Sequence, residues 1–485
     1  MLVSLSRVGA ARQSLTKTLA MTGADVRTLL ESVDLPDHPA GLPPVVLRAD
    51  ERTPGLFGVR MEGLWLGTPA ARDELFPYLG AVFGALARRA RLLGGAVHPT
   101  AVRLGPADGP AGSRPPAPLG GDRHELTAVD TVEQEVLANL LRRHSPVLIA
   151  LAGRGTVGGP PDRIGSRWLA DSREHLATRY LACADPRHLH RVRAEIRRRD
   201  GIADLVRMDV APVGGEDGSP ARVLVRCLDS QPSLADLRAQ SVLLAALALH
   251  ARRMVRSGRR EANLPQRLIE ENRARAVVQG MRARFVPAAG ARGRAGAPVP
   301  ARDAARQLLD ELVPELSLLD ATAEELFPLL APLELPGLGL PPLRTQDLLA
   351  LAAREGSAAL AARGELLLTA PQPGGVLLET VRRQAAGRVE LLLDGWRTAL
   401  ADAVAPRARP ATEPAPAGAG RQGGAPDGRT PDGGDRSRGG RPRTGRGRTA
   451  QGGARPVDPD RDARGGGAPH RRDRRGGRPP QKGEA

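Results

Sequence analysis

The segment from residue 406 to residue 485 sets the strongest limit on what this chain can fold into. It is rich in Gly, Pro, Arg and Asp, has almost no Leu, Ile, Val or Phe, and contains no aromatic residue. Ordering a chain costs conformational entropy that buried apolar side chains must offset, and this segment has very few of them. We therefore predict a disordered tail and a folded part that ends near residue 405.

The tail also holds more than half of the excess positive charge of the chain. From Arg407 to the end there are 19 basic and 9 acidic residues, a net charge of +10 out of +17 for all 485 residues. An arginine-rich segment of this kind can neutralise the phosphates of a nucleic acid or bind an acidic partner. Segments that bind RNA by stacking usually place aromatic residues among the arginines, and none is present here. A solvated extension without a partner is the alternative that we favour.

Cysteine use and hydropathy bear on where the chain works. Cys183 and Cys227 are the two cysteines, which excludes a disulfide framework and a CxxC metal pair. A reducing cytoplasm is the expected compartment. The longest strongly apolar run, residues 242–249, is far shorter than the roughly 20 residues that span a bilayer, so we expect no membrane contact. An oligomer is compatible with the sequence, but no interface is indicated.

Two further stretches rich in Pro and Gly, residues 106–121 and 287–300, divide the folded part. The first 24 residues contain no acidic residue. Two interpretations fit this: the residues form a targeting segment, or the true start of the chain is Met21. The boundaries predict four regions: a partly disordered N-terminal extension (1–44), a catalytic domain (45–290), a helical part (301–405) and the disordered tail (406–485).

Hydrophobic spacing predicts that helices dominate the folded part. Apolar residues recur at helical spacing in residues 75–86 and 132–141. A third helix is expected from Ser233 to about Arg256, because Ser233 and Asp236 form an N-terminal signal behind a proline.

Three shorter runs have the composition of strands: residues 57–66, 205–213 and 221–228. A glycine-rich connection joins the last two and is suited to a hairpin. Strands that are joined directly, with helices elsewhere, predict an α+β fold with an antiparallel sheet.

Charged residues within strands are the first candidates for chemistry, because the phosphate-loop, dinucleotide-loop and zinc-protease motifs are absent from the sequence. Arg226 and Asp229 interrupt the apolar run of residues 223–229. A charge in a strand must be paired, bound to a ligand or exposed. Alternation places Leu224, Arg226 and Leu228 on one face, and a solvent-facing arginine explains this pattern as well as a functional one.

Three segments in a fixed order resemble a known family. They are residues 207–212 (RMDVAP), residues 223–229 (VLVRCLD) and residues 271–276 (ENRARA). They resemble the Asp-x-Arg-Pro segment, the Glu-x-Arg-x-x-Asp strand and the Glu-Asn-x-x-x-Ala segment of the glutamate–cysteine ligase type-two family of carboxylate–amine ligases. Upstream, residues 58–62 (GVRME) lie where that family has a Gly-x-Glu-Glu-Glu strand. The resemblance covers about residues 45–330.

The resemblance implies a glutamine-synthetase-like antiparallel sheet with flanking helices and a two-step reaction. ATP phosphorylates the carboxylate of an amino-acid-like substrate, and an amine then displaces phosphate from the acyl phosphate to form an amide. The implied cofactors are ATP and Mg²⁺, because phosphoryl transfer needs a divalent metal and cationic groups around the phosphate oxygens. By matching position the resemblance implies catalytic roles for Arg226, Asp209 and Arg167, cofactor contacts from Arg163, Asp229 and Asn272, and metal ligation by Glu62 and His124.

The chain also departs from the family pattern. Family glutamates correspond here to Arg60, Met61 and Leu224, and a family arginine corresponds to Ala211. The loss of carboxylates should weaken metal binding. Two interpretations stay open: a divergent ATP-dependent carboxylate–amine ligase, or a catalytically degenerate ligase fold with an incomplete metal site that binds a partner or metabolite without turnover. The number of acidic metal ligands separates them.

Overall fold

The structure is a computed structural model that describes residues 12–51, 53–99, 120–153, 155–156, 164–171, 175–201, 204–215, 218–288, 296–335 and 354–404. The chain divides into two units, residues 1–408 and 409–485, and every described residue belongs to the first. The predicted disordered tail, residues 406–485, lies outside the described residues.

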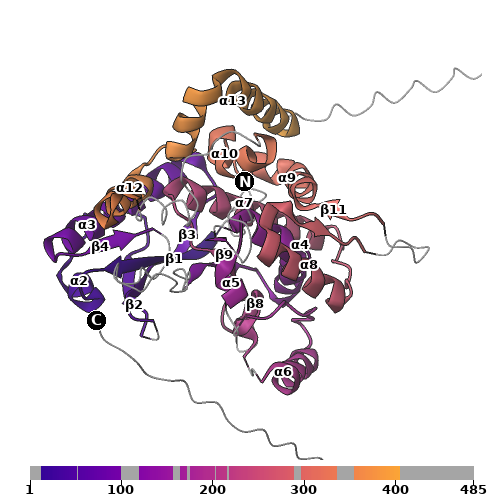
Figure 1. The fold of residues 1–485 in the computed structure, drawn as a ribbon. Helices are drawn as coiled ribbons and strands as arrows, with labels where there is room; N and C mark the ends of the chain where they lie inside the picture. The colour runs from indigo at the N-terminus through magenta and orange to yellow at the C-terminus, as the bar shows by residue number, and fades with distance from the viewer. Residues whose placement is uncertain are drawn as a thin grey trace, which may run out of the picture. The chain divides into compact units, whose positions relative to one another are not determined.

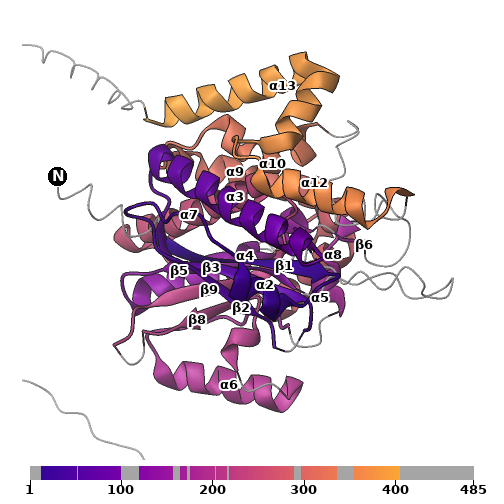
Figure 2. The same cartoon turned by 90° about the vertical axis from the view of Figure 1, so that its left-hand side faces the viewer.

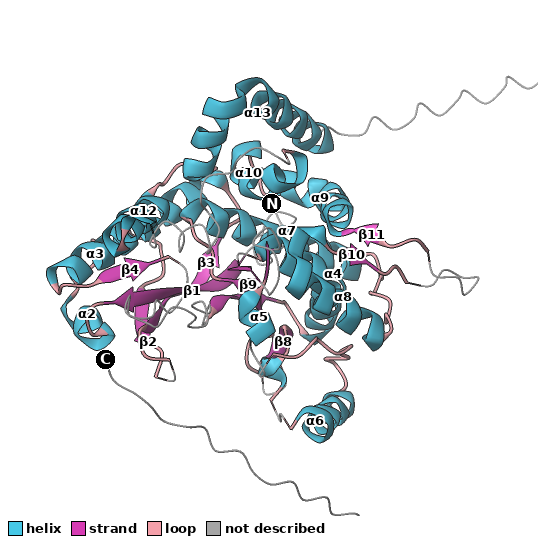
Figure 3. Ribbon diagram, in the orientation of Figure 1, coloured by secondary structure: helices cyan, strands magenta, loops and turns pink. Residues whose placement is uncertain are grey.

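An antiparallel sheet of seven strands lies at the centre of the described part of the chain (Figures 1 and 3). The strand order is β2–β3–β1–β5–β9–β8, and β4 also pairs with β1. The predicted α+β class with an antiparallel sheet is therefore confirmed. The strands are β1 (Arg12–Thr22), β2 (Val45–Ala49), β3 (Leu56–Trp65), β4 (Ala96–His98), β5 (Gly121–Thr127), β8 (Val210–Val213) and β9 (Arg222–Asp229). Two short hairpin pairs lie apart from it: β6 (Gly155–Thr156) with β7 (Ile164–Gly165), and β10 (Arg284–Phe285) with β11 (Val299–Pro300).

The strand predictions hold for β3 and β9 and only partly for the run at 205–213. Its first half is the 3-10 turn η2 (Leu205–Arg207), because the side chain of Asp204 accepts a hydrogen bond from the backbone of Val206 and starts a turn. Its second half is β8, which pairs antiparallel with β9 as the hairpin prediction requires.

The three helices predicted from spacing are present as α3 (Pro69–Leu92), α4 (Thr131–Ala152) and α7 (Leu234–Arg256). Ser233 caps α7 as predicted, since its hydroxyl accepts from the backbone nitrogen of Asp236 at 3.0 Å. The other described helices are α2 (Val26–Ser32), α5 (Arg167–Asp171), α6 (Pro186–Asp200), α8 (Gln266–Gln279), the 3-10 turn η3 (Gly280–Arg282), α9 (Ala301–Leu318), α10 (Ala323–Glu334), α12 (Ser357–Thr369) and α13 (Gly375–Val404).

Helices pack on one face of the sheet, which we call the covered face. Figure 2 shows α3, α7, α9, α10, α12 and α13 on this side, with α6 on the other side next to β8. The alternation in β3 agrees with this arrangement, because Phe57, Val59 and Met61 are buried on the covered face while Arg60 and Glu62 point the other way.

Two apolar clusters form the core. One joins β1 and β3 to α2 and α3, and the other joins β9 to α4, α7 and the helices after Val299. The predicted helical part, residues 301–405, therefore shares its core with the sheet domain.

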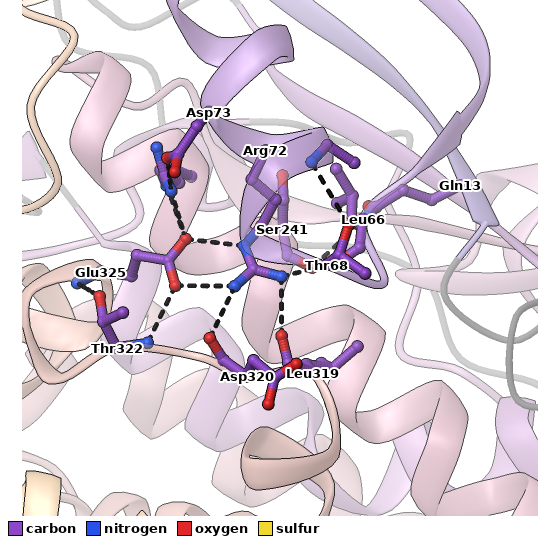
Figure 4. A network of polar contacts seen from close by, with 12 residues as sticks. Gln13, Leu66, Thr68, Arg72, Asp73, Ser241, Leu319, Asp320, Thr322 and Glu325 are labelled. Atoms are coloured by element: carbon purple, nitrogen blue, oxygen red, sulfur yellow. Dashed lines mark hydrogen bonds and ion pairs between the residues drawn. The ribbon is translucent and has the colours of Figure 1, made fainter. Parts of the chain in front are cut away.

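A buried ion network fastens α10 to α3 and α7 (Figure 4). Glu325 accepts from Arg72 at 2.7 and 2.9 Å and from Arg238 Nε at 2.8 Å. Arg72 also donates to the backbone oxygens of Leu66 and Leu319, and Thr322 closes a capping box with Glu325 at the start of α10. The helical part is thus tied to the sheet domain by charge as well as by apolar contact.

The strand β1 corrects the prediction for residues 1–44. Arg12–Thr22 was assigned to a partly disordered extension, yet it lies in the middle of the sheet between β3 and β5. Lys17 hid this strand, because a lysine predicts solvent exposure. Here it is 1% exposed, and its Nζ donates to Pro99 O at 2.7 Å and pairs with Asp122 Oδ1 at 3.2 Å. A chain that began at Met21 would lack this strand.

Among the described helices, α7 is long and apolar enough to cross a membrane. The most apolar part of it is entirely buried inside the protein, as in the central helix of a globular core.

Candidate functional site

Arginines lie along the face of the sheet opposite the covered face: Arg48 on β2, Arg60 on β3, Arg123 on β5, and Arg222 and Arg226 on β9. Four of them, Arg60, Arg123, Arg222 and Arg226, define the candidate site. Thr16 of β1 lies between two of them, because it pairs with Arg60 on one side and Arg123 on the other. Residues paired in this way share one side of a sheet. We call this surface, defined by the four arginines, the arginine face.

Arginines already hold the carboxylates on this face. Glu125 of β5 accepts from Arg60 at 3.1 Å and from Arg222 at 2.9 Å. Glu62 pairs with Arg60 at 2.9 Å, and its side chain is 64% exposed. Neither carboxylate is free to act as a metal ligand without losing an arginine partner.

Arg123 and Arg226 bring positive charge toward the β9 side of the face. Arg123 is accessible to solvent, and no hydrogen bond or ion pair joins its side chain to another described residue. Desolvation lowers the pKa of Arg123, and the nearby Arg207 and Arg60 lower it further against the opposite effect of Asp50. A guanidinium in such surroundings gains most from an added anion.

His175 lies among these arginines. Its ring packs edge-on against Trp168 at 4.4 Å, and its Nε2 is 3.5 Å from Arg226 Nη2. The side chain is buried, and Nδ1 has no hydrogen-bond partner in the described part of the chain. Burial, together with the neighbouring Arg226, Arg273, Arg123 and Arg207, lowers the pKa of His175 to about 3. The imidazole is therefore neutral at pH 7.

Asp209 is committed to one partner. Its two oxygens accept from Arg273 of α8 at 2.5 and 2.9 Å, and the side chain is fully buried. Burial alone would lower the pKa of Arg273, but the paired Asp209 raises it above the ordinary value. The backbone oxygen of Asp209 also accepts from Arg226 N at 2.9 Å, which fixes the start of β8 against β9.

The structure brings three of the predicted residues together: Asp209, Arg226 and Asp229 lie on or beside β8 and β9. Asp229 accepts a hydrogen bond from the hydroxyl of Ser166, and the same hydroxyl accepts from Leu169 N at 3.2 Å. These bonds hold the start of α5, and hence the backbone of Arg167, at the end of β9. The side chain of Arg167 and all of Arg163 lie outside the described residues, so their predicted roles stay predictions.

Glu62 and His124, which the resemblance implies as metal ligands, lie on opposite faces of the sheet and cannot hold the same ion. His124 pairs with Leu15 and Val225 on the covered face, and its Nδ1 contacts Gln13 Oε1 at 3.0 Å. Burial lowers its pKa to about 3. A glutamate that points away from the helices cannot share a metal with a histidine beneath them.

Asn272, the predicted cofactor contact, bonds to the protein backbone in the structure. Its Nδ2 donates to Val286 O at 2.9 Å, and its Oδ1 accepts from Val286 N at 2.8 Å. The amide thus completes a two-way bond with the backbone that follows β10, and both of its polar atoms are used.

Three residues of the site escaped the sequence predictions: Arg123, His175 and Arg273. Arg273 stands next to Asn272 in the ENRARA segment, so that motif contained a signal for it. No local pattern marks His175, because it reaches the site through a parallel bridge between Leu176 and Met208.

A Mg²⁺ ion requires several oxygen ligands in near-octahedral arrangement. The described residues contain no group of three or more His, Cys, Asp or Glu side chains that could hold a metal ion. The donor set of the arginine face therefore does not fit the divalent metal that the family resemblance implies.

Comparison with known proteins finds similarity only at the level of solved structures. A glutamate–cysteine ligase from Francisella tularensis in complex with AMP aligns over 81% of this chain and 97% of its own, with 11% identity and a TM-score of 0.42. A bifunctional glutathione synthetase from Pasteurella multocida aligns over 83% of this chain and 52% of its own, with 13% identity and a TM-score of 0.41. The complex of the ubiquitin-like protein Pup with its ligase PafA aligns over 80% and 81%, with 10% identity and a TM-score of 0.39.

No family model matches the chain, and no curated protein is similar to it. The three structural similarities have low sequence identity and low TM-scores, so the function below rests on the chain's own residues.

Proposed function

We propose that this protein binds a phosphorylated small molecule, with ATP as the first candidate, on its arginine face without a divalent metal, and that it does not turn the ligand over. In the terms of the sequence resemblance, it is the catalytically degenerate ligase fold. One observation carries the proposal. On the face of the sheet opposite the covered face, the carboxylates of Glu62 and Glu125 are paired with arginines and are therefore not available to a metal ion.

Arginines favour a phosphate ligand on chemical grounds. A guanidinium donates two parallel hydrogen bonds to a phosphate or carboxylate and stays charged at every physiological pH. Arg123 forms no hydrogen bond or ion pair with another described residue, although Asp50 and Glu125 lie close enough to attract it, and Arg226, Arg207 and Arg273 surround the neutral His175 within the same region. A phosphate group placed there would meet positive charge from both β5 and β9.

The same residues argue against turnover. Phosphoryl transfer by ATP-dependent ligases relies on metal ions that neutralise the phosphate oxygens in the transition state. The described residues do not supply the carboxylates for such ions. Fixed guanidinium groups can bind the phosphates in place of the metal, but they supply no metal-bound template for an acyl phosphate.

Isothermal titration calorimetry of the full-length chain with ATP, in excess Mg²⁺ and in excess EDTA, tests the proposal. We expect equal or tighter binding in EDTA, because metal-free ATP carries more negative charge. Arg123→Gln should weaken binding about tenfold, the value of one charge-assisted hydrogen bond. The matched control, Arg383→Gln, changes an exposed arginine on α13 and keeps the tail intact. The affinity of this variant for ATP should stay within about twofold of that of the unchanged protein.

A working ligase gives the opposite result. It would bind ATP only with Mg²⁺ and would release phosphate when an amino acid and an amine are added. That outcome, or the absence of binding to both ATP and pyrophosphate, would overturn the proposal.

A further inference from the structure

Helix α6 has two sharply different sides. Its buried side holds three apolar residues at helical spacing: Leu189, Val192 and Ile196. Its exposed side holds residues spaced by four, three and four positions, which form a straight stripe on a helix: Arg187, Arg191, Ala194 and Arg198, with Arg197 beside them.

The stripe has an acidic neighbour on the helix, the exposed Glu195, which forms no ion pair with another described residue. Arg187, Arg197 and Arg198 form no ion pair with another described residue, and Arg191 reaches Asp185 only at 3.6 Å. Like charges four residues apart on a helix repel each other. A bound polyanion would relieve this repulsion.

The side chains around the stripe narrow the class of polyanion. A protein partner usually contacts an apolar core within the interface, and the exposed side of α6 has no large apolar residue. A membrane-binding helix exposes its apolar side, whereas that of α6 is buried. Stacking on single-stranded bases relies mainly on Phe, Tyr and Trp, and α6 has none of these three. Arginine in a regular row matches a phosphate backbone.

We propose that α6 binds the backbone of double-stranded nucleic acid without reading its sequence. From Arg187 to Arg198 the stripe is about 16 Å long, which corresponds to the axial rise of about five base pairs. Figure 2 shows α6 on the side of the sheet away from α3 and α7. This surface is separate from Arg123 and does not depend on the function proposed above.

The test is fluorescence anisotropy of the full-length chain with a labelled duplex of about 20 base pairs of arbitrary sequence, measured over a range of salt concentrations. The test variant changes Arg187, Arg191, Arg197 and Arg198 to Gln. The matched control changes four exposed arginines on other helices to Gln: Arg88, Arg256, Arg383 and Arg388. Both variants remove the same net charge and leave the tail intact.

We expect the α6 variant to bind at least about tenfold more weakly and the slope of log K against log salt to fall by about 3 to 4, while the control stays within about twofold. A double variant, Arg187→Gln with Arg198→Gln, should lower the slope by about 2. It tests the same surface if the four substitutions together disturb folding. If the α6 variant and the control lost the same affinity for the duplex, binding would depend on net charge alone. If the α6 variant kept its affinity, binding would be assigned to the tail. Competition by polyglutamate as strong as by duplex, and lost in the α6 variant, would indicate an acidic protein. Each of these three results overturns the proposal.

Discussion

The two faces of the central sheet hold charge in opposite ways. On the covered face, Lys17 is 1% exposed and is surrounded by Asp122, Ser230 and the backbone of Pro99. On the arginine face, Arg60 and Arg222 share Glu125, Arg226 donates to the backbone oxygen of Val206, and Arg123 forms no hydrogen bond or ion pair within the described part of the chain. A buried charge persists only with dedicated partners, whereas an accessible surplus of one sign favours a ligand of the other sign.

The difference separates residues that support stability from residues that bind. Charges on the covered face, and in the network around Glu325, should control unfolding with little effect on ligands. Charges on the arginine face should control ligand binding with little effect on unfolding.

The largest effect is expected for Glu325→Ala, which removes the shared partner of two buried arginines, Arg72 and Arg238. Arg72 would then stay buried with backbone acceptors, while Arg238 keeps Asp73 at 2.6 Å. Leaving the Arg72 cation without a carboxylate should cost about 3–5 kcal/mol of unfolding free energy. Denaturant unfolding measures it. The neighbouring Glu324→Ala removes only the surface pair with Arg397, and it should cost no more than about 1 kcal/mol. Similar losses in the two variants would mean that the network is not a stabilising link.

The second effect concerns pH and the covered face. The folded-state pKa of His124, about 3, lies below its ordinary value of 6.5. The unfolded chain therefore takes up a proton as the pH falls below 6.5 and the folded chain does not, so this stability is present above pH 6.5 and is lost toward pH 3. Between pH 6.5 and 5.0 the contribution of His124 should fall by about 2 kcal/mol. His175, whose pKa is also about 3, loses stability in the same way in both proteins, so the total loss should be smaller in His124→Gln by the share of His124. Urea unfolding at a series of pH values checks this. Parallel stability curves for the two proteins would contradict it.

The third effect compares two neutral histidines on opposite faces. A phosphate bound near His175 would oppose the four arginines that help to lower its pKa, so ATP in EDTA should raise that pKa by about one unit or more. His124, beneath the sheet, should not respond. Titration of the histidine ring signals by NMR, with His175→Gln to assign the signal, measures both in one sample. A shift in both histidines would indicate a general change of structure instead of local binding.

The smallest effect is expected for Asp209→Asn. This change keeps the shape of the side chain but frees the positive charge of Arg273, so ATP should bind about threefold more tightly in EDTA. The ligase interpretation assigns Asp209 a role in orienting the substrate and expects weaker binding or lost activity. Calorimetry therefore distinguishes the two interpretations by the sign of the change.

Local patterns predicted much of the fold. The spacing of apolar residues in 75–86 and 132–141 was enough to find α3 and α4, and Ser233 marked the start of α7. A glycine-rich connection was enough to pair β8 with β9. These features depend on neighbours within a few turns, which a sequence contains directly.

The candidate site was predicted less completely. Asp209, Arg226 and Asp229 were found because they lie in one hairpin or just before it. The placement of Glu62 and His124 on opposite faces was not predicted, because the face on which a strand residue lies depends on register with strands far away in sequence. His175 was missed because a bridge to a distant segment brings it to the site.

The sequence by itself therefore determined several of the main helices and strands, the class of fold and the basic character of the chain. Only the tertiary structure decided which charges are buried with partners and which are left to a ligand. Lys17 and Arg123 are both basic residues within strands, but one is enclosed with Asp122 and the other is accessible among arginines. The reason is physical: the free energy of a charge depends on burial and on the sign of its neighbours, and both are set by contacts between residues distant in the chain.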